Sequence, residues 1–125
     1  MPPSSSSSGN TRSDFPVPIV HKIQICYKHI YRLGKKLPKR DMLGIHALVE
    51  TACLEMLALA IEAAFTPRAQ KKPLLQKLRI KTEVAKQLIR TEHEIAVISE
   101  TQYIALEEPL VEISKMVNGW IRSIP

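Results

Sequence analysis

The sequence contains few of the residues that mark several common classes of protein. Its 125 residues include two cysteines, four glycines and only 5% aromatic residues. Two cysteines, Cys26 and Cys53, are too few for a disulfide scaffold and are typical of a reducing compartment, so we expect a cytoplasmic protein. So few glycines argue against a loop-rich all-β fold. There is neither a glycine-rich phosphate loop nor any other catalytic motif, which predicts a protein that is not an enzyme and uses no cofactor.

What the chain does contain is an excess of positive charge. Eighteen lysines and arginines against twelve aspartates and glutamates give a net charge of +6. The composition, 45% hydrophobic and 24% charged, is that of one soluble globular domain. A basic excess of this size in so short a chain indicates a polyanionic partner such as nucleic acid.

The most apolar stretch, residues 47–65, is about as long as a bilayer span. It carries Glu50, Glu55 and Glu62, and each of these carboxylates would be costly in hydrocarbon. The N-terminus has no apolar segment of the kind that a signal peptide needs. We therefore expect a soluble protein that is not exported and does not contact a membrane.

Residues 1–18 are rich in serine and proline and have almost nothing to bury, which predicts a disordered tail. The folded domain is then expected over residues 19–125. Apolar side chains recur at helical spacing over residues 17–33, 40–65 and 73–95. Three amphipathic helices are therefore predicted after the tail.

A fourth helix is predicted to begin at a capping box that runs from Ser99 to Gln102. Its apolar seam repeats at spacings of three and four, and its members are Tyr103, Leu106, Leu110, Ile113, Val117, Trp120 and Ile124. Pro109 lies inside this helix and is expected to kink it or to leave one carbonyl unpaired. Four helices joined by short links predict an all-α, up-down-up-down four-helix bundle.

The second predicted helix is apolar over most of its circumference. A single small bundle covers only one side of such a helix, so the pattern predicts a homo-oligomer. We assign four of its apolar residues to the oligomer interface, namely Leu48, Ala52, Met56 and Leu59.

The net charge is distributed in blocks. Residues 17–40 hold seven basic residues and no acid, and residues 65–90 hold eight basic residues and one acid. The segments 41–64 and 91–108 hold only acids, four and five respectively. A run of cations without acids repels itself unless an anion binds there, so the first and third helices are the predicted nucleic-acid-binding surface. The predicted residues are Lys22, Lys28, Arg32, Lys35, Lys36, Lys39, Arg40, Arg68, Lys71, Lys72, Lys77, Arg79, Lys86 and Arg90.

Other arrangements of reactive side chains are weaker. His21, Cys26 and His29 share one helix but point in different directions, which argues against a metal site. Cys26 and Cys53 each lie on an apolar face, as core thiols do. The aromatic residues Tyr27, Tyr31, Tyr103 and Trp120 are interpreted first as core anchors, with base stacking as a second possibility.

Several short segments resemble a known family when their order and spacing are taken together. The basic first helix ends in residues 37–41 (LPKRD), and the third helix contains residues 88–90 (LIR). The last helix opens with residues 98–103 (ISETQY) and closes with residues 115–123 (KMVNGWIRS). Over residues 20–124 the chain resembles the four-helix-bundle family that includes the accessory variability determinant (Avd) of diversity-generating retroelements. Proteins encoded in intervening sequences of bacterial 23S ribosomal RNA genes are related to this family.

The resemblance implies a homopentameric barrel of bundles with a basic surface. It also implies an accessory role in which the assembly associates with a reverse transcriptase and its RNA template and supports mutagenic synthesis of complementary DNA. On the third helix, Lys77, Arg79, Lys86 and Arg90 match the place where such proteins carry exposed basic residues. We therefore extend the nucleic-acid-binding role of the family to these four residues.

Four alternatives remain open at this point. The chain could be a bundle of the ribosomal intervening-sequence type, or a structural bundle whose basic faces dock an acidic protein. It could also be a small metal or redox bundle that uses His21, Cys26 and His29. The basic faces themselves could be ordinary solvated helix surfaces that bind no anion.

Overall fold

The computed structural model describes residues 17–125, and the fold is all-α. Its four long helices are α1 (Val17–Gly34), α3 (Ile45–Ala64), α4 (Lys72–Glu94) and α5 (Glu100–Arg122). Two short elements, α2 (Lys39–Leu43) and the 3-10 turn η2 (Arg68–Gln70), lie in the connections. The predicted tail, residues 1–18, falls outside the described part except for its last two residues, which begin α1.

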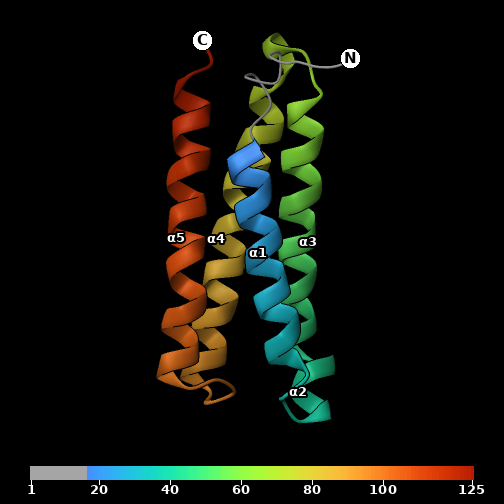
Figure 1. The fold of residues 1–125 in the computed structure, drawn as a ribbon, viewed down its shortest axis with the longest axis vertical. Helices are drawn as coiled ribbons and strands as arrows, with labels where there is room; N and C mark the ends of the chain where they lie inside the picture. Colours follow the sequence, from blue (N-terminus) through green and yellow to red (C-terminus); the bar gives the residue numbers. More distant parts are fainter. Residues whose placement is uncertain (1–16) are drawn as a thin grey trace, which may run out of the picture.

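The four long helices form an up-down-up-down bundle, as predicted. Consecutive long helices run antiparallel, and the contacts follow the order α1, α3, α4, α5 and back to α1 (Figure 1). One end of the bundle carries α2 and the α4–α5 turn, and the other end carries the link with η2 and the C-terminus (Figure 1). The two links that contain α2 and η2 therefore lie at opposite ends of the molecule.

The core is filled by one face of each long helix. Helix α1 buries Ile23, Cys26 and Ile30, whereas Lys28 and Arg32 on its outer face are exposed. This sidedness follows from the helical spacing of apolar residues in the sequence. The largest apolar side chains that are fully buried are Ile23, Ile30, Met56, Leu75, Leu78, Ile89, Leu106, Leu110 and Ile113.

The predicted second helix, residues 40–65, is not continuous, and this prediction was wrong. It is interrupted at Gly44, where φ is −95° and ψ is −115°, so that α2 ends at Leu43 and α3 begins at Ile45. A Cβ atom on residue 44 would lie 2.7 Å from the carbonyl oxygen of Arg40. Only glycine fits this close approach of the backbone, and α2 can therefore turn away from the axis of α3.

Helix α5 begins with the predicted capping box. The Gln102 amide donates to the Ser99 hydroxyl at 3.1 Å, and the Ser99 amide donates to the Gln102 side chain at 2.8 Å. Four residues of the predicted seam are fully buried, and Tyr103 and Trp120 pack against the core while remaining partly exposed. The helix continues through Pro109 to Arg122.

The turn between α4 and α5 is closed by backbone hydrogen bonds to Glu92. Ala96 has a φ of 64°, the left-handed conformation that often ends a helix. The amide of Ala96 donates to the carbonyl of His93 at 3.0 Å, and the amide of Val97 donates to the carbonyl of Glu92 at 2.8 Å. These two bonds form a Schellman motif, so the backbone of Glu92 is held firmly at this end of the bundle.

Helix α3 exposes apolar side chains outside the core. Leu48 is 58% exposed and Leu54 is 44% exposed. The segment Lys39–Ala64 contains an 18-residue window with a mean hydropathy of 1.6 and could cross a membrane by length and composition alone; one third of that window is buried inside the chain. Core helices of other proteins pass the same test, so this finding is weak support for a membrane span.

Candidate nucleic-acid interface

Six cations form one surface at the end of the bundle that carries α2. Lys28 and Arg32 lie on the outer face of α1, Lys35 and Lys36 lie in the turn directly after it, and Lys39 and Arg40 follow on α2; all six are exposed. We call these six residues the basic surface. Within residues 17–125, none of the six forms an ion pair with a carboxylate. In the part of the chain that the structure describes, these six charges are therefore not held in ion pairs.

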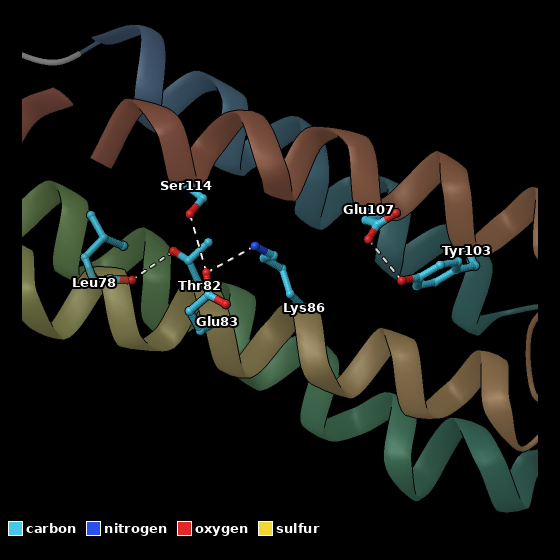
Figure 2. A network of polar contacts seen from close by, with 7 residues as sticks. All are labelled: Leu78, Thr82, Glu83, Lys86, Tyr103, Glu107 and Ser114. Carbon is cyan, nitrogen blue, oxygen red and sulfur yellow. Dashed lines mark hydrogen bonds and ion pairs between the residues drawn. The ribbon is translucent and has the colours of Figure 1, made fainter. Parts of the chain in front are cut away.

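The predicted cations of α4 are arranged differently, because several are paired with acids. Lys86 contacts Glu83 at 3.1 Å, and the same carboxylate oxygen accepts from Ser114 of α5 at 3.5 Å (Figure 2). Arg90 contacts Glu94 at 3.4 Å. These contacts compensate part of the positive charge that the sequence places on α4.

Two further contacts link cations to neighbouring helices. Lys22 of α1 contacts Glu112 of α5 at 2.8 Å, and this lysine lowers the pKa of the Glu112 carboxyl. Lys81 of α4 contacts Glu55 of α3 at the same distance, 2.8 Å. Lys77 and Arg79 are exposed on α4, and in the part of the chain described neither of them is in an ion pair. They remain candidates for phosphate contacts.

At the opposite end, two of the residues predicted to bind nucleic acid donate hydrogen bonds to backbone carbonyls of their own chain. Arg68 donates from Nη2 to the backbone carbonyl of Ser123 at 2.6 Å. Lys71 donates from Nζ to the carbonyl of Ala63 at 2.5 Å, and the same ammonium lies 5.8 Å from the centre of the Trp120 ring. A cation near the last carbonyls of α3 stabilises that helix end. Lys72, the next predicted residue, is exposed.

The four residues assigned to an oligomer interface separate into two groups. Ala52 is 4% exposed and Met56 is fully buried within the core of their own chain, so neither side chain is available to a second copy. That part of the assignment is corrected. Leu48 is exposed and Leu59 is partly exposed, which leaves both accessible. The error arose because an almost wholly apolar helix carries no sequence signal for which side faces its own core.

Apolar side chains also lie exposed on α4, beside the accessible part of α3. A shallow hollow of about 350 Å³ is lined by Leu59 and Ala58 of α3 and by Ile80 of α4. A second hollow of about 400 Å³ continues along α4 past Val84 and Leu88. Ile80, which is 56% exposed, belongs to both hollows. This α4 face is not evident from the sequence, because its basic residues dominate the pattern.

A buried polar pair connects three helices near the basic surface. His46 of α3 and Glu92 of α4 are both fully buried, and His46 Nδ1 lies 2.7 Å from Glu92 Oε2. The other ring nitrogen, Nε2, lies 2.7 Å from the carbonyl oxygen of Ile30 in α1. Gly34 packs against the ring so closely that a Cβ there would lie 2.8 Å from His46 Cδ2. No sequence signal indicates this pair, because its members are 46 residues apart.

The protonation state of the pair follows from its geometry. A carbonyl oxygen only accepts, so Nε2 must carry a hydrogen, and a second proton must lie between Nδ1 and the Glu92 carboxylate. Burial by itself lowers the pKa of His46. The hydrogen bonds to Glu92 and Ile30 and the negative charges of Glu92 and Glu50 outweigh burial, so that the pKa of His46 is raised. One carboxylate oxygen, Glu92 Oε1, is buried and has no hydrogen-bond partner among residues 17–125.

The residues considered for a metal site do not converge. His21 and His29 are exposed on α1, whereas Cys26 is buried in the core. Among the described residues, no group of three or more His, Cys, Asp or Glu side chains is placed to hold a metal ion. Cys26 and Cys53 are both free and buried, as expected of core thiols.

A comparison with protein-family models matches residues 17–124 to the model described as bAvd-like. The chain belongs to the bAvd-like family. The match covers the whole bundle and confirms the resemblance to Avd proteins that the sequence motifs indicated. Family membership indicates an accessory protein of the Avd type. No curated protein and no solved structure matches the chain significantly.

Proposed function

We propose that this bAvd-like chain is a non-catalytic accessory subunit of a diversity-generating retroelement. In this role it binds the reverse transcriptase and the template RNA or complementary DNA and supports mutagenic reverse transcription. The observation that carries the proposal is the basic surface, whose six cations have no carboxylate partner among residues 17–125. Cations of this kind bind phosphates without reading base sequence.

The basic surface is the primary nucleic-acid contact in this proposal, and the exposed α4 cations Lys77 and Arg79 extend it. Lys86 and Arg90 contribute less, because each already contacts a carboxylate on its own helix. Lys22, Arg68 and Lys71 act mainly in holding helices and links together. Thirteen of the fourteen predicted residues, all except Lys72, are thereby divided according to what each cation already contacts.

Two variants with the same reduction in charge test this division. The first replaces Lys35, Lys36, Lys39 and Arg40 of the basic surface with alanine. The second, a matched control, replaces the ion-paired Lys22, Lys81, Lys86 and Arg90 with alanine. Binding of labelled RNA and DNA is measured by fluorescence anisotropy at several salt concentrations. We expect the first variant to bind more weakly, and its salt dependence should be shallower by about one unit for each phosphate that is no longer neutralised.

The control should bind almost as well as the unmodified chain. Equal weakening in both variants would show that net charge alone drives binding and would contradict the assignment to the basic surface. If the unmodified chain bound neither RNA nor DNA at physiological salt, the nucleic-acid role itself would be wrong. Binding of an acidic protein in place of nucleic acid would favour the alternative of a structural docking bundle.

The proposed subunit is also a homo-oligomer. The supporting observation is the exposed apolar surface of α3 and α4, where Leu48 and Ile80 are both more than half exposed. The number five is taken from the family resemblance. Sedimentation equilibrium of the unmodified chain and of Leu48→Lys with Ile80→Lys tests this part. We expect a pentamer for the first and a smaller species for the second, and a monomeric unmodified chain would contradict it.

A further inference from the structure

Tyr31 is the aromatic residue that departs most from the role predicted for it. The tyrosines and the tryptophan were predicted to be core anchors, and Tyr27, Tyr103 and Trp120 do pack against the core. The side chain of Tyr31, in contrast, is 46% exposed on α1. An exposed ring on a helix needs no explanation by itself. Its surroundings are what make this ring unusual.

The Tyr31 ring lies among the cations of the basic surface. Lys35 places its Nζ 5.0 Å from the ring centre, which is a cation–π contact. Residues 31 and 32 are three and four positions after residue 28 on α1, so Lys28 and Arg32 share this side of the helix with Tyr31, and Lys35 follows in the turn directly after the helix. The ring and three exposed cations thus lie together at this end of the bundle.

A second tyrosine supports the ring on the side toward α3. The ring centres of Tyr27 and Tyr31 are 6.2 Å apart, and the rings are tilted by 36°. Burial raises the pKa of Tyr27, and the charge of Glu50 adds to this effect, which places a carboxylate on the Tyr27 side. Lys28 and Arg32 are exposed on the outer face of α1, so phosphates are attracted to that side of the Tyr31 ring.

We propose that Tyr31 is a stacking platform for an unpaired base and that Lys28, Arg32 and Lys35 hold the phosphates beside that base. This inference rests on the proposed nucleic-acid role and adds the class of ligand, which is single-stranded RNA or DNA. In a duplex the faces of each base are already covered by its neighbours, so a duplex offers only its phosphates to the basic surface. Stacking of a base on an aromatic side chain does not depend on which base it is.

The experiment compares three proteins on three labelled ligands by fluorescence anisotropy. The proteins are the unmodified chain, Tyr31→Leu and Tyr31→Phe. The ligands are a single strand, a duplex of the same length and a single strand with abasic sites, which keeps the phosphates and lacks bases. Since one stacked base typically contributes a factor of about ten in affinity, we expect Tyr31→Leu to bind the intact single strand about tenfold more weakly.

Binding of the duplex and of the abasic strand should be the same for Tyr31→Leu and the unmodified chain. Tyr31→Phe keeps the ring and should bind all three ligands as the unmodified chain does. Equal weakening of Tyr31→Leu on every ligand would mean that Tyr31 only positions the cations, and the stacking proposal would then be overturned while the nucleic-acid role stood. A change of oligomeric state in Tyr31→Leu would overturn it as well, because Tyr31 would then lie between copies. Failure of the unmodified chain to bind any of the ligands would contradict the proposed function itself.

Discussion

The two ends of the bundle carry similar clusters of cations, but the cations of the two clusters make different contacts. At the end with η2, Arg68 binds the carbonyl of Ser123 and Lys71 binds the carbonyl of Ala63 and faces Trp120. At the end with α2, the exposed cations of the basic surface have no carboxylate partner within residues 17–125. In the sequence, both clusters are short basic runs next to a proline, and nothing in their composition separates them.

The comparison shows that the role of a cation depends on which hydrogen-bond acceptors lie within its reach. At the η2 end, the backbone carbonyls of Ser123 and Ala63 lie within reach of Arg68 and Lys71 and accept hydrogen bonds from them. At the α2 end, the link leads away from α3 at Gly44, so Lys39 and Arg40 face solvent. The support of this end comes instead from the buried pair of His46 and Glu92 beneath it.

The largest expected effect on stability comes from breaking the buried pair of His46 and Glu92. Glu92→Ala leaves the His46 ring buried without its partner, and breaking a buried pair in this way typically costs about 3–5 kcal/mol of unfolding free energy. We expect a cooperative chemical denaturation curve with a much lower midpoint. Glu92→Gln is the control, because its amide can donate to a neutral Nδ1 and should cost less. A decrease below about 1 kcal/mol for Glu92→Ala would show that the pair does not support the basic end.

A smaller effect on stability is expected when the pH is raised, and it should differ between the two ends of the bundle. The pKa of His46 is raised above its unfolded value, so the pair contributes its full stability below about pH 6.5 and loses it as pH rises through the folded pKa. For one proton the slope in that window is about 1.4 kcal/mol per pH unit. The His46 ring faces the Ile30 carbonyl from α1, Glu50 from its own helix α3 and Glu92 from α4.

Amide hydrogen exchange, corrected for its intrinsic dependence on pH, measures this effect at both ends of the bundle. Protection around Gly34 and His46 should fall as pH rises, whereas protection around Ala63 should not change. In Glu92→Gln, protection at the two ends of the bundle should respond to pH in the same way. A uniform decrease in protection along the whole chain would contradict a local role for the pair, and NMR titration of the His46 ring would identify the titrating group directly.

The smallest expected effects come from replacing one cation at each end of the bundle. Lys71→Met removes the contact with the end of α3 and is expected to lower the unfolding free energy by about 1 kcal/mol, with little change in affinity for RNA. Lys36→Met removes the same charge from the basic surface and should weaken RNA binding without lowering stability. Thermal melts and anisotropy on both proteins make the comparison. If the two variants behaved alike, the distinction between the ends would be wrong.

The helical periodicity of the sequence predicted most of the fold. The sidedness of α1, the capping box at Ser99 and the seam of α5 are local patterns, and local patterns are readable because side chains three and four positions apart lie on one helix face. The break at Gly44 was missed because a glycine inside an apolar run is also compatible with a continuous helix. The inward position of Ala52 and Met56 was missed because α3 is apolar almost all round.

The sequence by itself determined that this protein is an all-α bundle with alternating basic and acidic helices, since both properties depend on residue type and on spacing along the chain. Its motifs also determined the family, which the match over residues 17–124 confirmed. Only the tertiary structure decided which cations are free, which are bound to carboxylates or carbonyls, and that His46 and Glu92 meet. Those contacts join residues that are distant in the chain, such as Arg68 with Ser123, and no local pattern encodes the distance between two helices.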